Sequence, residues 1–196
     1  PISPRSLITS YWTELLSARF MALALLMTIA SGSMFIFNGI SSLIAISMLH
    51  VAPDSYGELT LISSAGLFFG ALVSSRLATS KTVATNLTYA LTCIFTGSLL
   101  MLIAFVAHFI NLYTLLVPAF IIFFGTAIMI PNASMGALQQ AHKPAIGASI
   151  VNAMALIGSS FLLRGVAHMY THTALALPGA LFILSIIAAA LLLGFV

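Results

Sequence analysis

Long apolar runs separated by short polar turns make up most of the sequence. Each run reaches the roughly 20 apolar residues that a helix needs to cross a hydrocarbon core about 30 Å thick. We therefore predict an all-α polytopic membrane protein with six transmembrane helices. The predicted spans cover approximately residues 20–49, 57–78, 83–107, 112–140, 144–170 and 174–196.

Residues 1–19 are expected to lead into this bundle. Tyr11, Leu15 and Ala18 recur at helical spacing, and Trp12 beside them is typical of the headgroup level of a bilayer. This pattern predicts a cytoplasmic or interfacial helix. The sequence begins without a methionine and ends inside an apolar run, so we expect it to be part of a longer protein.

The composition agrees with a membrane protein and excludes several other classes. Hydrophobic residues make up 61% of the chain and charged residues 5%, against about 25% charged residues in an average soluble domain. The formal charge of +3 rests on so few groups that it indicates no nucleic-acid partner. Cys93 is the one cysteine, which excludes an internal disulfide and a cysteine-based metal site.

The few charged groups are divided unevenly between the two ends of the predicted bundle. Asp54 and Glu58 fall on the side away from the N-terminus, where no turn holds Lys or Arg. By the positive-inside rule the opposite, basic side is cytoplasmic, and both termini are then cytoplasmic. The basic residues on that side are Arg5, Arg19, Arg76, Lys81 and Lys143.

Carboxylates are expected only at the span boundaries, where Glu14, Asp54 and Glu58 fall. Proton relays in membrane proteins usually place Asp or Glu within a span. We therefore predict that this chain does not house such a relay.

Three amide side chains, Asn38, Asn132 and Asn152, lie near the middle of the first, fourth and fifth predicted spans. An amide in hydrocarbon must find a hydrogen-bond partner, either on another helix or in a water-filled cavity. The sequence leaves both possibilities open. Pro131, beside Asn132, removes a backbone donor and kinks its helix, which suits a moving helix as well as a static bend.

Small residues lie on one face of the second predicted span. Gly66 and Gly70 are four residues apart, and Ser74 follows one turn later. This spacing lets two membrane helices pack closely.

Arg164 is the one formal charge deep in a predicted span. An arginine at the centre of a span costs about 2.5–3.5 kcal/mol, which makes Arg164 a functional candidate. The alternative is a side chain that reaches the interface near Tyr170 and lies at the rim of a gate.

Catalytic and metal-binding patterns are incomplete. Gly147-Ala148-Ser149 lacks the second glycine of a serine-nucleophile motif. His168 and His172 have the i, i+4 spacing of a metal-binding pair, but they straddle a turn without a third ligand. We therefore expect neither an enzyme nor a metal site.

Several short motifs follow one another in a characteristic order along nearly the whole chain. They are Tyr11-Trp12, Arg19-Phe20, Tyr56-Gly57, the segment from Gly70 to Arg76-Leu77, Pro131-Asn132 and Gly147-Ala148-Ser149. In this order they resemble the C-terminal six-helix half of a major facilitator superfamily transporter. The similarity is closest to the drug:proton antiporters of the bicyclomycin-resistance type.

The resemblance implies that the chain holds spans seven to twelve of a twelve-span transporter in the lipid bilayer of a bacterial inner membrane. The N-terminal six-helix half of the same protein would be its partner, with a substrate cavity between the halves and alternating access by rocking. The segment from Gly70 to Arg76 resembles a cytoplasmic loop signature, with Ser74 or Ser75 in its acidic position. The candidate gate and helix-packing residues, taken from these patterns together, are Arg76, Gly66, Gly70, Pro131 and Arg164.

We therefore predict a secondary transporter that exports small amphipathic molecules in exchange for protons. It would use no cofactor beyond the proton gradient, and its proton-coupling acid is implied to lie in the N-terminal half. The candidate cavity residues are Asn38, Phe35, Phe124, Asn132 and Asn152. The alternative is a six-span subunit or degenerate half-transporter that binds partner membrane proteins and moves nothing, which the small-residue face and the position of the carboxylates favour.

Overall fold

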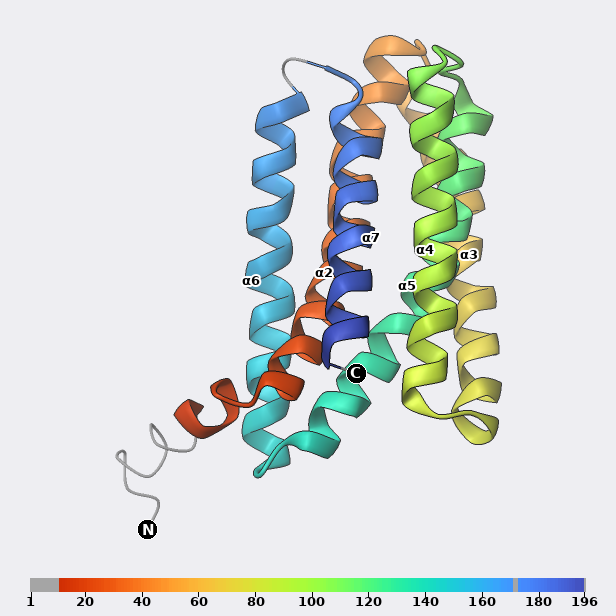
Figure 1. Ribbon diagram of the computed structural model, residues 1–196. Coiled ribbons are helices and arrows are strands. Elements are labelled where there is room, and N and C mark those ends of the chain that lie inside the picture. Colours follow the sequence, from red (N-terminus) through yellow and green to blue (C-terminus); the bar gives the residue numbers. More distant parts are fainter. Residues whose placement is uncertain (1–10, 171–172, 196) are drawn as a thin grey trace.

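The computed structural model describes residues 11–170 and 173–195, and the regular elements among them are helices (Figure 1). Among the described residues, six helices are long and apolar enough to cross a membrane. The predicted fold class is therefore confirmed: the chain is an all-α polytopic membrane protein with six spans. In chain order the elements are α2 (Ala18–Leu43), the π-helical turn η1 (Ile44–Met48), α3 (Pro53–Ser80), α4 (Val83–Val106), α5 (Leu112–Gln140), α6 (Pro144–Tyr170) and α7 (Ala176–Phe195).

Local sequence signals mark where several of these helices begin. Pro53 occupies the start of α3, where its missing N–H has no intrahelical partner to lose. Thr82 caps α4 by accepting a hydrogen bond from the backbone N–H of Thr85 (3.3 Å). Asn111 and Thr114 form a reciprocal capping box at the start of α5.

Two helices, α2 and α5, form the centre of the bundle. α2 packs against α5, α6 and α7, whereas α5 packs against α2, α3 and α4, and α4 also packs against α7. The helices α6, α2, α5 and α3 are thus successive neighbours. At the two ends of that series, α3 and α6 are the least covered helices, with only 22% and 28% of their most apolar segments buried.

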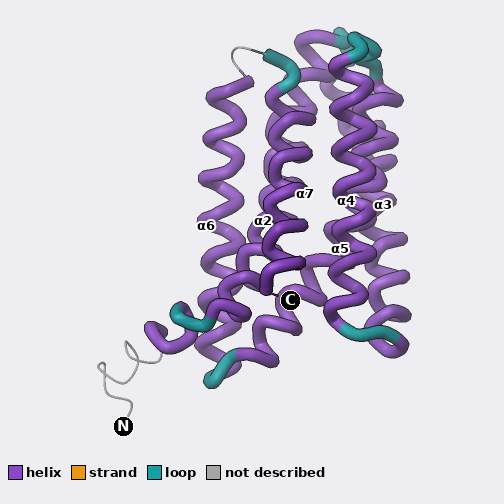
Figure 2. The backbone as a smooth tube through the Cα atoms, in the orientation of Figure 1, coloured by secondary structure: helices purple, strands orange, loops and turns teal. Residues whose placement is uncertain are grey.

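Loops gather at the two ends of the bundle (Figure 2). The α3–α4 turn, the α5–α6 turn and both ends of the described chain lie at the same end, which places Lys81 and Lys143 together with Arg19 (Figure 1). Asp54 lies at the opposite end, at the start of α3. Arg5 lies outside the described residues, and the assignment of the basic end to the cytoplasm stays a prediction.

The segment before the first span is short in the described part of the chain. Residues 11–15 are helical, the chain turns at Leu16 and Ser17, and α2 begins at Ala18. Ser17 caps α2 by accepting from the backbone N–H of Phe20 (3.5 Å). Residues 1–10, which the predicted lead-in also includes, lie outside the described residues.

Buried hydroxyl groups form hydrogen bonds between helices. These bonds fix how the helices are rotated toward one another, which apolar packing alone would not do. The hydroxyl groups of Ser41 on α2 and Tyr56 on α3 are 2.7 Å apart. On the other side of the bundle, Ser98 of α4 donates to Ser185 of α7 (3.3 Å). Such bonds contribute about 0.6 kcal/mol each on average between membrane helices, so they specify orientation more than they add stability.

Candidate functional site

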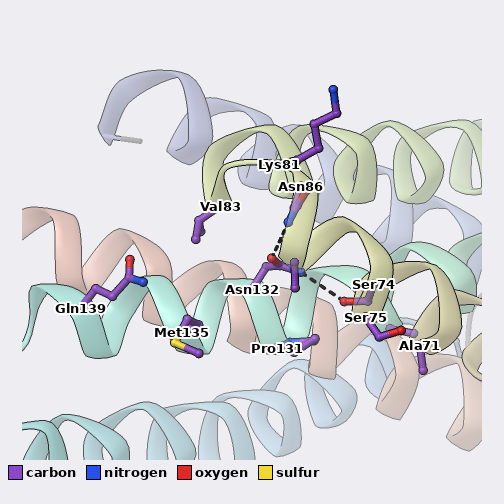
Figure 3. A pocket seen from close by; sticks show the side chains of 12 residues that line it. Ala71, Ser74, Ser75, Lys81, Val83, Asn86, Pro131, Asn132, Met135 and Gln139 are labelled. Atoms are coloured by element: carbon purple, nitrogen blue, oxygen red, sulfur yellow. Dashed lines mark hydrogen bonds between the residues drawn. The ribbon is translucent and has the colours of Figure 1, made fainter.

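A pocket of about 450 Å³ lies between α3, α4 and α5, near the turn that joins α3 to α4 (Figure 3). Ser74 and Ser75 come from α3, Asn86 from α4 and Asn132 from α5. Its other lining residues are Ala71, Ala78, Lys81, Val83, Ala127, Pro131, Met135 and Gln139. We take this pocket as the candidate site because it gathers polar side chains from three helices.

Asn132 is the centre of a hydrogen-bond network that joins these three helices. Its side chain is buried, with 6% of the residue exposed. The Nδ2 atom of Asn132 donates to Ser74 Oγ on α3 (3.2 Å) and to the carbonyl oxygen of Ile128 on its own helix (2.8 Å). Asn86 Nδ2 on α4 donates to Asn132 Oδ1 (2.9 Å). Asn132 therefore forms the joint of a three-helix unit.

The partners of this network determine how both amides are oriented. A carbonyl oxygen can only accept, so the atom of Asn132 that faces Ile128 must be the NH₂ group. Asn132 Oδ1 then faces Asn86, which must present its own NH₂ group. This leaves Asn86 Oδ1 buried with no hydrogen-bond partner among the described residues. A buried acceptor in that state costs about 1–3 kcal/mol.

The close approach of α3 to α5 brings Ser74 within reach of Asn132. A Cβ atom added at Gly66 would overlap the carbonyl oxygen of Phe120, and one added at Gly70 would overlap that of Phe124. Backbone atoms cannot swing aside, so both positions require the absence of a side chain. The predicted small-residue face of the second span thus lies directly against the backbone of α5.

Pro131 lies within α5 and lines the same pocket as Ala127, the residue four positions before it. Because proline has no N–H, the Ala127 carbonyl lacks its usual intrahelical donor. α5 is bent along its length (Figure 2). The pocket therefore adjoins a point where α5 is weakened by one hydrogen bond.

Comparison with known proteins gives one informative similarity. The chain is similar to a multidrug resistance protein. It is 28% identical over 138 residues to Multidrug resistance protein D of Escherichia coli strain K12, and the matched region covers 70% of this chain. The matched region covers 34% of that protein, about a third of the length of this relative. No family model matches the chain.

The remaining predicted cavity residues lie outside the Asn132 network. Phe35 and Asn38 on α2 are both exposed, three residues apart and on one face of that helix. Asn152 on α6 is exposed, and its Nδ2 atom donates to the carbonyl of Ala148 in the same helix (3.0 Å). Phe124 of α5 is partly buried against the core. The structure thus separates the three amides into one buried joint and two exposed groups.

The two predicted gate arginines lie toward opposite ends of the bundle. Arg76 is exposed near the end of α3 that carries the α3–α4 turn. Arg164 is exposed near the opposite end, six residues before α6 ends at Tyr170. His168 follows in the last turn of α6, and His172 lies outside the described residues. A group of three or more potential metal ligands is not found in the part of the chain that the structure describes.

Sequence analysis did not single out Asn86. It lies one turn into α4, close to the end of the span rather than at its middle. Asn86 and Asn132 are separated by 46 residues, and no local pattern shows that they meet. One signal in the sequence could have identified Asn86. It is an amide within a membrane span, and such an amide requires a hydrogen-bond partner on another helix or in water.

Proposed function

We propose that this chain is the C-terminal six-helix half of a major facilitator superfamily transporter, and that the whole protein exports small amphipathic molecules in exchange for protons. The observation that carries this proposal is the similarity to Multidrug resistance protein D over 138 residues. The six apolar spans support it, because a transporter of this kind is built from membrane-spanning helices.

Exposed polar groups on the least covered helices support the presence of a second half. Ser149, Asn152 and Ser160 of α6 are all exposed. The hydroxyl groups of Ser149 and Ser160, like the amide of Asn152, donate to carbonyls within α6 itself. An amide that faces lipid would leave its remaining donor and acceptor unsatisfied, so such a surface is better suited to a protein partner or a water-filled cavity.

The proposed cavity uses the exposed amides rather than the buried one. Asn38 and Asn152 would hydrogen-bond the substrate, with Phe35 and Phe124 as apolar wall, because both amides retain donor and acceptor capacity. Asn132, whose amide is committed to Asn86 and Ser74, would hold α3, α4 and α5 together while the halves rock.

The coupling proton is proposed to bind in the N-terminal half. The described spans carry Asp54 and Glu58 only in the first turns of α3, too close to the membrane surface for a mid-membrane relay. We further propose a bacterial inner membrane as location, with both termini in the cytoplasm and Arg76 at the cytoplasmic gate. No catalytic step or cofactor is required.

The proposal is tested with the full-length protein in proteoliposomes, using a fluorescent lipophilic cation as probe and an imposed pH gradient. Wild type is expected to move the probe only when the gradient is present. Asn38→Ala and Asn152→Ala are expected to lower the rate at least about tenfold, the loss of about 1.4 kcal/mol of transition-state stabilisation, and to leave the amount of folded protein unchanged.

Thr92→Ala is the matched control, because the exposed Thr92 hydroxyl on α4 likewise donates within its own helix, to the Thr88 carbonyl (2.9 Å). Its transport rate is expected to equal that of wild type. Absence of gradient-driven movement for a panel of amphipathic probes would overturn the export proposal and favour the alternative, a structural six-span subunit.

A further inference from the structure

Glu14 is a buried carboxylate in the segment that precedes the first span. Only 1% of the residue is exposed, whereas Trp12 and Leu16 on either side are 66% and 82% exposed. The carboxylate of Glu14 is therefore turned inward, against the turn between α5 and α6. A buried charge requires partners that compensate for lost hydration, and these partners identify what the contact does.

One oxygen of Glu14 caps α6. The Glu14 Oε1 atom accepts a hydrogen bond from the backbone N–H of Lys143 (2.9 Å), the residue that precedes the first residue of α6, Pro144. A lysine side chain has no acceptor with which to cap a helix. The positive end of the helix dipole also favours a carboxylate here. Glu14 thus supplies, from 129 residues away, the cap that the local sequence does not provide.

The other oxygen of Glu14 is buried with no hydrogen-bond partner among the described residues. The imidazole of His142 lies beside it, with its Nδ1 atom 3.7 Å from Glu14 Oε2. The side chain of His142 is 68% exposed, so its imidazole is open to solvent. Only the protonated imidazole carries the charge that would complete an ion pair with this oxygen.

The titratable groups that face the Glu14 carboxylate are few. A small pocket of about 170 Å³ surrounds it, lined by Thr13 from its own segment and by His142 and Lys143 from the α5–α6 turn. Histidine is the side chain whose charge ordinarily changes between about pH 5 and 8, and His142 is the histidine that lines this pocket.

The contact lies where three helices converge. A Cβ atom added at Gly147, in the first turn of α6, would come within 2.8 Å of Ala141 Cβ at the end of α5 and 3.4 Å of the Phe20 ring at the start of α2. The beginning of α6 therefore has little freedom to shift unless its contacts with α5 and α2 open. The Glu14 contact lies at this same point, at the start of α6, the helix that carries Asn152.

We propose that Glu14 and His142 form a proton-dependent clasp that ties the segment before α2 to the start of α6. Protonation of His142 completes the ion pair and closes the clasp. As pH rises and the imidazole loses its charge, the pair is lost and only the bond to the Lys143 N–H remains. The clasp is a property of the described chain and does not depend on whether the protein transports anything.

The test uses spin labels at Leu16→Cys and Ala145→Cys, two exposed positions on either side of the clasp, in a Cys93→Ser background. The full-length protein is placed in nanodiscs of phosphatidylcholine, and the label-to-label distance distribution is measured at about pH 5.5 and pH 8.5, which bracket the usual range of imidazole titration. We expect a narrow distribution at the lower pH and at least a twofold broader one at the higher pH.

Two variants separate the clasp from a simple helix cap. His142→Gln, which changes an exposed side chain, is expected to give the broad distribution at both pH values, and Glu14→Gln is expected to do the same. His108→Gln, an exposed histidine in the α4–α5 turn at the opposite end of the bundle, is the control and should keep the wild-type response.

A wild-type distribution that does not change with pH would overturn the proposal, as would a pH response that survives in His142→Gln. Should Glu14→Gln fail to fold, His142→Gln still decides the question. Because the readout is a distance, failure of the transport proposal would leave this result unaffected, and the reverse also holds.

Discussion

Replacing Asn132 with leucine tests whether the amide network is a structural joint. The substitution removes the bonds to Asn86, Ser74 and Ile128 while keeping a side chain of similar length. Bonds between membrane helices contribute about 0.6 kcal/mol on average and up to about 1.7 kcal/mol, and a buried amide left without partners costs about 1–3 kcal/mol. We expect Asn132→Leu to lower the free energy of unfolding by about 2 kcal/mol, mostly because Asn86 is then unsatisfied.

The decisive measurement is a double-mutant cycle. Asn86→Leu alone leaves Asn132 Oδ1 without its donor, and we expect a loss of about 1–2 kcal/mol. The double variant contains neither amide, and it also removes the unpartnered Asn86 Oδ1 atom. Its loss should therefore be smaller than the sum of the single losses by about 1–2 kcal/mol, the coupling typical of residues in one network.

Unfolding is followed by far-ultraviolet circular dichroism in mixed micelles with increasing dodecyl sulfate, because the one tryptophan, Trp12, lies outside the bundle core. Asn152→Leu is the control, since its exposed amide bonds only within α6, and its effect should stay within about 0.5 kcal/mol. Strictly additive losses for Asn86 and Asn132, or an Asn132→Leu protein as stable as wild type, would refute the assignment of Asn132 as the joint.

Two further substitutions test the packing around the pocket. Gly70→Ala places a Cβ atom against the Phe124 carbonyl and is expected to lower the unfolding free energy by about 1–3 kcal/mol. Gly57→Ala, which meets no atom within 4 Å, should be neutral or slightly stabilising, and equal effects at the two glycines would contradict the packing argument. Pro131→Ala restores a donor for the Ala127 carbonyl, so we expect a more stable protein by about 1 kcal/mol and slower transport; a less stable protein would show that the bend is required for folding.

The number and type of spans could be predicted because length and hydrophobicity alone decide them in a membrane. Which face of each helix is buried could not be predicted, because lipid and the bundle interior are both apolar. A membrane helix lacks the polar stripe that orients a helix in water. Asn38, Asn132 and Asn152 look alike in sequence for this reason, yet only Asn132 is buried. Glu14 shows the same limit at a boundary, since its burial depends on a turn more than a hundred residues away.

The network centred on Asn132 also bears on how the chain is made. It joins α3, α4 and α5, which are consecutive in the sequence. During synthesis the side chains of Ser74, Asn86 and Asn132 can therefore form their hydrogen bonds as soon as α5 enters the bilayer. α2 precedes these three helices in the sequence, yet two of its main partners, α6 and α7, follow them. α2 consequently enters the membrane before two of its main partners have been synthesised.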